Sequence, residues 1–147
     1  LRASGQSLNM SSVTLSSAVS ELRGPTSGRG FITDSDDNIG RTIAGTANSD
    51  TLSGLGGNDT LVPLGGSDFL VGGVGDDQIS VKANGDINSG TVISGGAGTD
   101  SIVVTSTSVT QLDLTGSLAT TERWDTSGGA SNGVQILTNN SNLFFSK

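Results

Sequence analysis

The chain contains no cysteine and no histidine in its 147 residues, and Glu21 and Glu122 are its only glutamates. The lack of cysteine excludes disulfides and thiolate metal sites. The lack of histidine excludes histidine bases, histidine-containing catalytic triads and histidine-ligated zinc. Serine is abundant, but no serine lies in a G-x-S-x-G elbow with a base available. We therefore expect that the chain itself is not an enzyme.

Apolar residues are also scarce. Hydrophobic residues make up 32% and aromatic residues 3% of the chain, whereas glycine occurs 23 times. This is too little apolar material for a thick globular core, but a solenoid needs only a thin apolar stripe in each turn. The length fits one domain or a small pair, and no stretch approaches the length of a membrane span. No signal peptide is visible and the chain starts at Leu1, so we expect a fragment or processed piece of a longer polypeptide.

Positive charge is low as well. Lysine and arginine together number 7 against 14 acidic residues, which leaves a formal net charge of −7. This balance argues against binding to nucleic acid and to anionic membranes. An acidic surface can serve solubility alone. Many of these aspartates, however, recur at one position of a repeat, and cation binding explains that recurrence better.

The repeats are nine residues long and fill residues 45–103. In register they read GTANSDTLS (45–53), GLGGNDTLV (54–62), PLGGSDFLV (63–71), GGVGDDQIS (72–80), a degenerate VKANGDINS and GGAGTDSIV (95–103). The shared pattern is G-G-x-G-x-D-x-U-x, where U is a large apolar residue. Self-similarity at a fixed short period predicts a solenoid, here an all-β parallel β-roll with glycine-rich loops.

Each residue type that recurs in the nonapeptide has a physical role. Glycines permit the backbone angles needed to curl around an ion, the apolar residue points into the roll from a short strand, and aspartate and carbonyl oxygens are ligands that suit calcium. The candidate aspartate ligands are Asp50, Asp59, Asp68, Asp77, Asp86 and Asp100. The candidate backbone positions are Gly45, Gly54, Gly56, Gly65, Gly72, Val74, Gly95 and Ala97.

Two nonapeptides make one turn, so units two apart stack on the same side. This places Asp50, Asp68 and Asp86 on one side, and Asp59 and Asp77 on the other, with Asp100 one turn plus a five-residue insertion after Asp77. If the insertion lies at 87–91, the inward apolar column is Leu52, Leu61, Leu70, Ile79, Ile93 and Ile102. Ions that bridge same-side loops give about four calcium sites, from the loop pairs 1/3, 2/4, 3/5 and 4/6.

These repeats resemble those of the repeats-in-toxin (RTX) family. The match covers roughly 45–103 and is strong in units 2, 4 and 6. Units 1 and 3 are weaker because Thr46 and Asn48 replace glycines and Pro63 and Leu64 open the third loop; unit 5 keeps Asp86 but lacks most glycines. The resemblance implies a secreted bacterial protein, exported through a one-step channel, that folds when it meets extracellular calcium. It implies no single activity.

The N-terminal flank, residues 1–44, allows alternative structures. Apolar residues at Leu15, Ala18, Val19 and Leu22 have helical spacing before Gly24, which allows a short helix at 16–22. Strands at 7–10 and 13–15 are the competing prediction. The segment TDSDDNIG (33–40) is either a worn repeat, with Asp37 and Ile39 in the D-x-U places, or a solvated acidic turn that includes Asp34 and Asp36.

The C-terminal part, residues 104–147, lacks glycine loops but retains strand-like segments about every ten residues. We expect either a continued solenoid without ions or a β cap, because an open solenoid end exposes unpaired backbone. Trp124, Phe144 and Phe145 are natural covers for that end. A carbohydrate platform at Trp124 is the sharper alternative, but packing is more common for a lone tryptophan.

Three functions fit these features. The first is a calcium-binding extracellular structural protein that folds on calcium and assembles with itself as a surface layer, filament or matrix. The second is the folding and secretion module of a larger type I-secreted enzyme, toxin or adhesin. The third, ice or carbohydrate binding, is poorly supported because Phe69, Gln78 and Ser101 interrupt the threonine column begun by Thr51 and Thr60. Calcium and further copies of the chain are the expected partners, without nucleic acid or membrane insertion.

Overall fold

The computed structural model describes residues 21–23, 28–34, 38–129 and 133–138, and every regular element in these ranges is a β-strand. The first seven strands are β1 (Glu21–Arg23), β2 (Phe31–Thr33), β3 (Thr42–Ala44), β4 (Thr51–Gly56), β5 (Thr60–Val62), β6 (Phe69–Val74) and β7 (Gln78–Val81). They are followed by β8 (Val92–Ala97), β9 (Ser101–Val104), β10 (Gln111–Leu114), β11 (Ser117–Ala119), β12 (Arg123–Asp125) and β13 (Gln135–Thr138). No helix long and apolar enough to cross a membrane occurs in these ranges.

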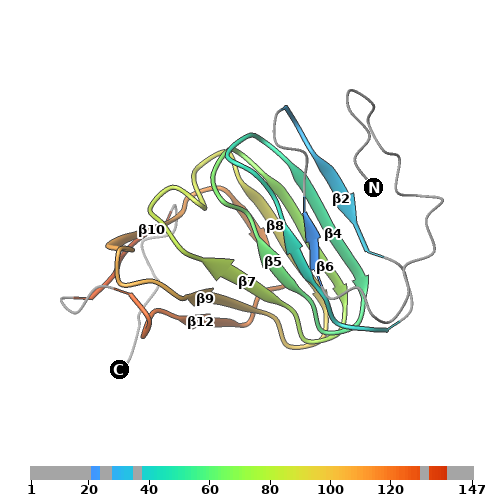
Figure 1. Cartoon of the computed structure of the whole chain (residues 1–147). Coiled ribbons are helices and arrows are strands. Elements are labelled where there is room, and N and C mark those ends of the chain that lie inside the picture. The colour runs from blue at the N-terminus through green and yellow to red at the C-terminus, as the bar shows by residue number, and fades with distance from the viewer. Residues whose placement is uncertain (1–20, 24–27, 35–37, 130–132, 139–147) are drawn as a thin grey trace.

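The strands form two parallel sheets that face each other across a thin core (Figure 1). One sheet has the order β1-β3-β5-β7-β9-β12, and the other has the order β11-β8-β6-β4-β2. Successive strands of the repeat region alternate between the sheets, so two strands complete one turn and each strand pairs with the strand one turn away. This is the expected parallel β-roll, and the prediction of the fold is confirmed.

The strand register confirms the expected inward column. In one sheet Leu52 pairs with Leu70 and Leu70 with Ile93, and in the other sheet Leu61 pairs with Ile79 and Ile79 with Ile102. All six side chains are at most 3% exposed. The step from Leu70 to Ile93 is longer than the preceding step because extra residues lie in the loop between β7 and β8, before Thr91. The insertion was predicted at 87–91, just after Asp86, and this placement is wrong, because Thr91 rather than Asp86 stands in register with Asp68.

Strands from both flanks extend the same two sheets. At the N-terminal end, Leu22 pairs with Ile43, and Ile32 pairs with Leu52. Of the helix predicted at 16–22, only residues 21 and 22 are described, and they lie in strand β1; the strands predicted at 7–10 and 13–15 lie outside the described residues. The roll therefore begins before the first clear repeat.

The register proposed for the 33–40 segment as a worn repeat is wrong. Ile43 pairs with Leu61, so Ile43 rather than Ile39 takes the apolar place. Arg41, two residues earlier, takes the place of the repeat aspartate. Asp37 lies outside the described residues. The preceding turn has Ile32 in the apolar place and Gly30 in the aspartate place.

The C-terminal part both continues the roll and adds a third sheet of two strands. Leu118 of β11 pairs with Ile93, and Trp124 of β12 pairs with Ile102. Strands β10 and β13 form a separate parallel pair at the end of the molecule remote from β2 (Figure 1). Trp124 is partly buried and packs against the core cluster, as expected for a cover rather than an exposed platform. Phe144 and Phe145 lie outside the described residues.

Candidate metal centre

The repeat aspartates on one side of the roll are joined by a ladder of hydrogen bonds. The backbone N–H of Arg41 donates to Oδ1 of Asp59 (2.7 Å), and that of Asp59 donates to Oδ1 of Asp77 (2.8 Å). The N–H of Asp77 then donates to Oδ1 of Asp100, and the N–H of Asp100 to Oε2 of Glu122, both at 2.8 Å. Each carboxylate is thus fixed by the turn before it. The prediction that Asp59, Asp77 and Asp100 stack is confirmed by this register.

The other side has a shorter ladder. The N–H of Gly30 donates to Asp50, and the N–H of Asp50 donates to Oδ1 of Asp68 (2.8 Å). After Asp68 the strand register leads to Thr91, because Phe69 pairs with Val92. Asp86 remains on this side of the roll, in the enlarged loop between β7 and β8, and its charge acts on Asp68. It does not join the ladder, so the prediction that Asp86 stacks on Asp50 and Asp68 is wrong: its carboxylate is held within its own loop, and Thr91 takes its place.

Four of the six aspartates keep their second carboxylate oxygen buried without a hydrogen-bond donor. These oxygens are Oδ2 of Asp59, Asp68, Asp77 and Asp100, each on a residue no more than 1% exposed. Buried polar atoms are nearly always partnered, so an unpartnered charged oxygen needs an explanation such as an ion. The same open oxygen in four of the six repeat loops indicates that each of these loops binds a ligand of the same kind.

Asp50 and Asp86 differ from these four. Oδ2 of Asp50 accepts bonds from the N–H and hydroxyl of Thr46, at 2.6 Å and 2.8 Å. Oδ2 of Asp86 accepts bonds from the N–H groups of Lys82 (2.7 Å) and Ala83 (2.9 Å). In both loops, protein donors already occupy the oxygen that the other repeats leave open, so these two loops hold a cation less readily.

Backbone carbonyls face the open oxygens at the first position of the loops. A Cβ added at Gly72 would collide with both Oδ2 of Asp77 and the carbonyl oxygen of Gly95, and one at Gly54 would collide with Oδ2 of Asp59 and the carbonyl oxygen of Gly72. Carboxylate and carbonyl oxygens from adjacent turns therefore converge on one space, which only glycine leaves free.

The remaining predicted backbone positions lie around the same loops. A Cβ at Gly45 would meet the carbonyl oxygen of Pro63 at 2.7 Å and Oδ2 of Asp50 at 3.0 Å. The carbonyls of Val74 and Ala97 instead accept hydrogen bonds from Gly57 and Gly75 in the preceding turn. Gly56 ends strand β4, and Gly65 has a φ of 99° in the loop before Asp68.

The donor set fits calcium. No cluster of three or more acidic, histidine or cysteine side chains occurs in the described part of the chain. A site here would therefore combine one or two carboxylates with backbone carbonyls, a set of hard oxygens that calcium accepts in flexible geometry. When bound, calcium would neutralise the buried carboxylates and join adjacent turns.

Two residues in the aspartate column were missed by the sequence analysis. Arg41 holds the column position before Asp59, and its guanidinium donates to Oδ1 of Asp34 (2.7 Å) with both side chains fully buried. Glu122 holds the position after Asp100. Their signals are the triplets R-T-I and E-R-W, in which the third residue matches the apolar place of the repeat but the first is not aspartate; neither triplet is distinctive.

Burial changes the acidity of the open carboxyls. It raises the pKa of Asp59 and of Asp68 to about 7, and that of Asp77 to about 6. Backbone hydrogen bonds oppose the shift, while nearby carboxylates such as Asp34, Asp50 and Asp100 add to it. The calcium-free roll therefore favours the neutral forms of these groups.

This shift predicts that acid stabilises the calcium-free roll. Because the folded pKa values lie above the unfolded ones, the stabilisation is complete below the unfolded pKa and is lost as the pH rises through about 6 to 7. In calcium-free buffer, circular dichroism should show more strand at pH 5 than at pH 8. At saturating calcium the order should reverse, since protons compete with the ion. A calcium-free strand signal that rises with pH would contradict this assignment.

The ladder predicts a ranking of aspartate substitutions. Asp77→Ala removes an open oxygen and leaves the buried N–H of Asp59 without its acceptor, a loss of about 1–3 kcal/mol before any ion is counted. The calcium concentration needed for folding should rise at least several-fold. Asp125→Ala is the matched control, since Asp125 is exposed and accepts its hydrogen bond from nearby Ser127. Equal calcium midpoints for the two variants would contradict the assigned register.

Comparison with known families agrees with this geometry. Residues 42–70 match the model of the RTX calcium-binding nonapeptide repeat (4 copies). This range runs from β3 through the first two repeats to the apolar residue of the third. No curated protein matches the chain, and no solved structure matches it. The chain therefore carries RTX calcium-binding nonapeptide repeats on a parallel β-roll.

Proposed function

We propose that this chain is an extracellular structural protein that folds on calcium and assembles with further copies of itself. The observation that carries the proposal is the set of buried carboxylate oxygens without donors in four of the six repeat loops. RTX repeats are typical of secreted bacterial proteins, which supports a location outside the cell, where calcium is abundant. The β-roll is a structural calcium-binding unit rather than a catalytic fold, and we assign it no reaction.

The ions would lie between loops on the same side of the roll. The best-supported sites combine Asp59 with the carbonyl of Gly72 and Asp77 with the carbonyl of Gly95. Asp68 supplies an open oxygen on the other side. The site that uses Asp50 is the weakest, because Thr46 already donates twice to its carboxylate. Equilibrium dialysis with radioactive calcium should count about four ions per chain.

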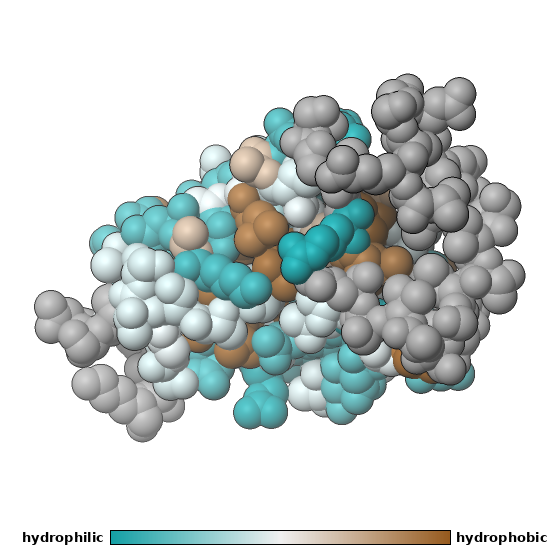
Figure 2. Space-filling view, viewed as in Figure 1, coloured by the Kyte–Doolittle hydropathy of each residue, from teal (hydrophilic) through white to brown (hydrophobic). Residues whose placement is uncertain are grey.

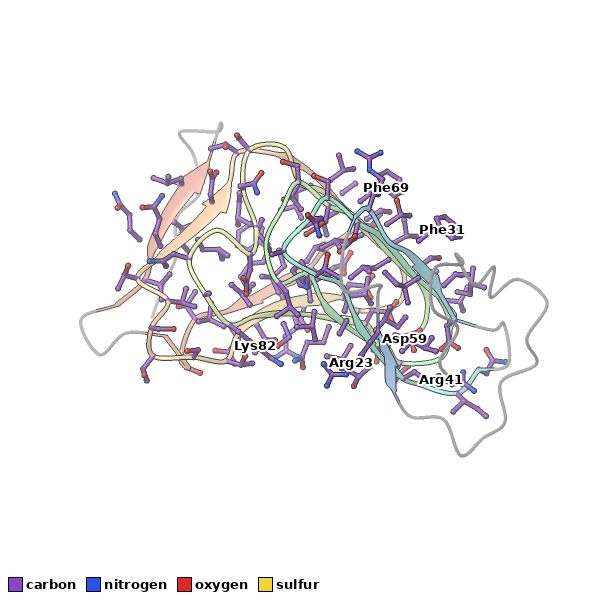
Figure 3. The ribbon with its side chains drawn as sticks, turned by 45° about the horizontal axis from the view of Figure 1, so that its top comes forward. Arg23, Phe31, Arg41, Asp59, Phe69 and Lys82 are labelled. Atoms are coloured by element: carbon purple, nitrogen blue, oxygen red, sulfur yellow. The ribbon has the colours of Figure 1, made fainter. Side chains whose placement is uncertain are left out.

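The outer face of the sheet that contains β4 and β6 supports self-association. Phe31, Thr51, Phe69 and Val92 form one row across adjacent strands, and Phe31 and Phe69 are 71% and 47% exposed. Figure 3 shows both phenylalanines near each other at the outer edge of the molecule. Exposed apolar residues also gather in a small patch amid hydrophilic side chains on the face drawn in Figure 2. Apolar surface of this kind marks contact sites.

Light scattering tests the assembly. We expect the calcium-loaded chain to form species larger than a monomer as its concentration rises. The double variant Phe31→Thr, Phe69→Thr should remain monomeric, because it replaces both exposed phenylalanines with threonine, the polar residue already present in the row at Thr51. Val74→Thr is the matched control, since Val74 is 61% exposed but lies outside this row.

A calcium-loaded monomer at high concentration, with no filaments or sheets by electron microscopy, would contradict self-assembly. It would leave the second function, a calcium-dependent folding and secretion module of a larger enzyme, toxin or adhesin. Sequencing the gene outward distinguishes that function directly, because a catalytic domain on the same polypeptide would support it.

A further inference from the structure

The chain returns to the aspartate column once more after the last repeat. Arg123 of β12 pairs with Ser101, so Glu122 lies beside Asp100 and Trp124 lies beside Ile102. The triplet Glu122-Arg123-Trp124 thus repeats the D-x-U arrangement with a longer acid and a larger apolar residue. The residues before it, from Ser117 to Thr121, contain none of the glycines of the nonapeptide.

The geometry at this end reproduces that of the repeat loops. A Cβ added at Gly95 would collide with both Oδ2 of Asp100 and the carbonyl oxygen of Thr120. The equivalent pair one turn earlier is Oδ2 of Asp77 with the carbonyl oxygen of Gly95. Asp100 is fully buried and its Oδ2 has no hydrogen-bond donor, so an unpartnered carboxylate oxygen is aimed into this space.

The turn that supplies the carbonyl is held in place. Thr120 has a φ of 47°, a backbone conformation that residues other than glycine rarely adopt. Its hydroxyl accepts the N–H of Gly96 at 2.9 Å, which fixes the turn against the last repeat loop. Glu122 completes the arrangement by accepting the N–H of Asp100 at 2.8 Å. Two carboxylates from adjacent turns therefore meet beside one inward carbonyl.

The two acids repel each other when no cation is present. A divalent cation between the two turns would neutralise both charges and supply the partner that Oδ2 of Asp100 lacks. The ligands are all hard oxygens, which favours calcium over softer metals.

We propose a calcium site at the C-terminal end of the column, formed by Asp100, Glu122 and the carbonyl of Thr120, outside the nonapeptide repeats. The inference rests on the proposed calcium binding of the repeats and adds an ion that the repeat pattern does not predict. This ion fastens strand β12 onto the roll. Calcium thereby controls the docking of Trp124 against the core, and not only the folding of the repeats.

The test uses the full chain with Glu122→Gln, which keeps the side-chain shape and an acceptor for the N–H of Asp100 but removes the charge. Equilibrium dialysis at about 10⁻³ M calcium should show one ion fewer than the unchanged chain. Asp125→Asn, on the same strand but exposed, should keep the full count. Glu122→Asp should restore the ion, because aspartate is the residue that the repeats use at this place.

A second measurement reports on this site without depending on the count. Trp124 is the only tryptophan and the chain has no tyrosine, so terbium luminescence excited through tryptophan arises most strongly from an ion near Trp124. Glu122→Gln should lose most of this signal, whereas Asp59→Asn, three turns away in the column, should retain most of it. Circular dichroism of each variant at saturating ion shows that the roll has formed.

The outcomes separate the two proposals. An unchanged ion count together with unchanged terbium luminescence in Glu122→Gln would overturn the terminal site while leaving the repeat sites intact. A chain that binds no calcium before any substitution would instead overturn the proposed function itself. A variant that folds only at higher calcium, with its ion count and luminescence both reduced, supports the terminal site.

Discussion

Removal of calcium at pH 7.5 with excess EGTA should abolish the strand signal of the chain. Without ions, the open oxygens of Asp59, Asp68, Asp77 and Asp100 would be buried carboxylates with neither a donor nor a counter-charge. The apolar column contributes only one side chain per strand, too little to offset the entropy of ordering the loops. The calcium-free chain should therefore be largely disordered under these conditions.

Calcium should restore the fold cooperatively. Each site that binds only the folded chain stabilises it by about 2.7 kcal/mol when free calcium is 100 times its dissociation constant. Several such sites act on one equilibrium, so circular dichroism should show a steep transition at about 10⁻⁴–10⁻³ M calcium. Magnesium at the same concentration is the control and should fail, since it keeps its waters and requires near-octahedral geometry. An unchanged strand signal in EGTA at pH 7.5 would refute ion-dependent folding.

Arg41→Met should cost about 3–5 kcal/mol of folding free energy even at saturating calcium, because it removes the guanidinium that neutralises the buried carboxylate of Asp34. The guanidinium of Arg41 is held in place because it donates to Oδ1 of Asp34 (2.7 Å) and to the carbonyl of Ile39 (3.2 Å). Arg41 also lowers the pKa of Asp59 by its charge, although burial outweighs this effect. Figure 3 shows Arg41 and Asp59 in the same part of the roll.

Urea denaturation at fixed calcium measures this loss. Arg123→Met is the matched control, since Arg123 is exposed on β12 and its substitution should stay within about 0.5 kcal/mol. Adding Asp34→Asn to Arg41→Met should recover part of the loss, because the second change removes the buried charge that Arg41 neutralised. A loss below about 1 kcal/mol for Arg41→Met would mean that the Arg41–Asp34 pair does not anchor the first turns.

The repeat period was sufficient to predict the two-sheet roll and the inward column, but not the position of the insertion, which lies before Thr91. Those features follow from the spacing of Leu52, Leu70 and Ile93, in which an apolar residue recurs on a fixed side of a short strand. The repeat period could not predict in which loops the aspartate Oδ2 lacks a hydrogen-bond donor. Asp50 and Asp77 occupy the same motif position, yet Thr46 donates to the first carboxylate and no donor reaches Oδ2 of the second.

The ends of the aspartate column were harder to predict for a related reason. Arg41 and Glu122 are in register with the aspartates only because strands β3 and β12 pair in parallel with β5 and β9. Neither residue is preceded by a glycine loop, and their charge or length differs from the motif. Their roles depend on three-dimensional register, which local pattern matching does not report.

The aspartate ladder gives the roll a direction. In every rung the donor N–H comes from the earlier turn and the accepting carboxylate from the later one, from Arg41 with Asp59 through Asp100 with Glu122. A piece of the roll cut off at its C-terminal side therefore ends on an N–H group that lacks its carboxylate, whereas a piece cut at its N-terminal side ends on a carboxylate that lacks its N–H donor. The two ends of a severed roll are chemically unequal: one presents a hydrogen-bond donor and the other presents a negative charge.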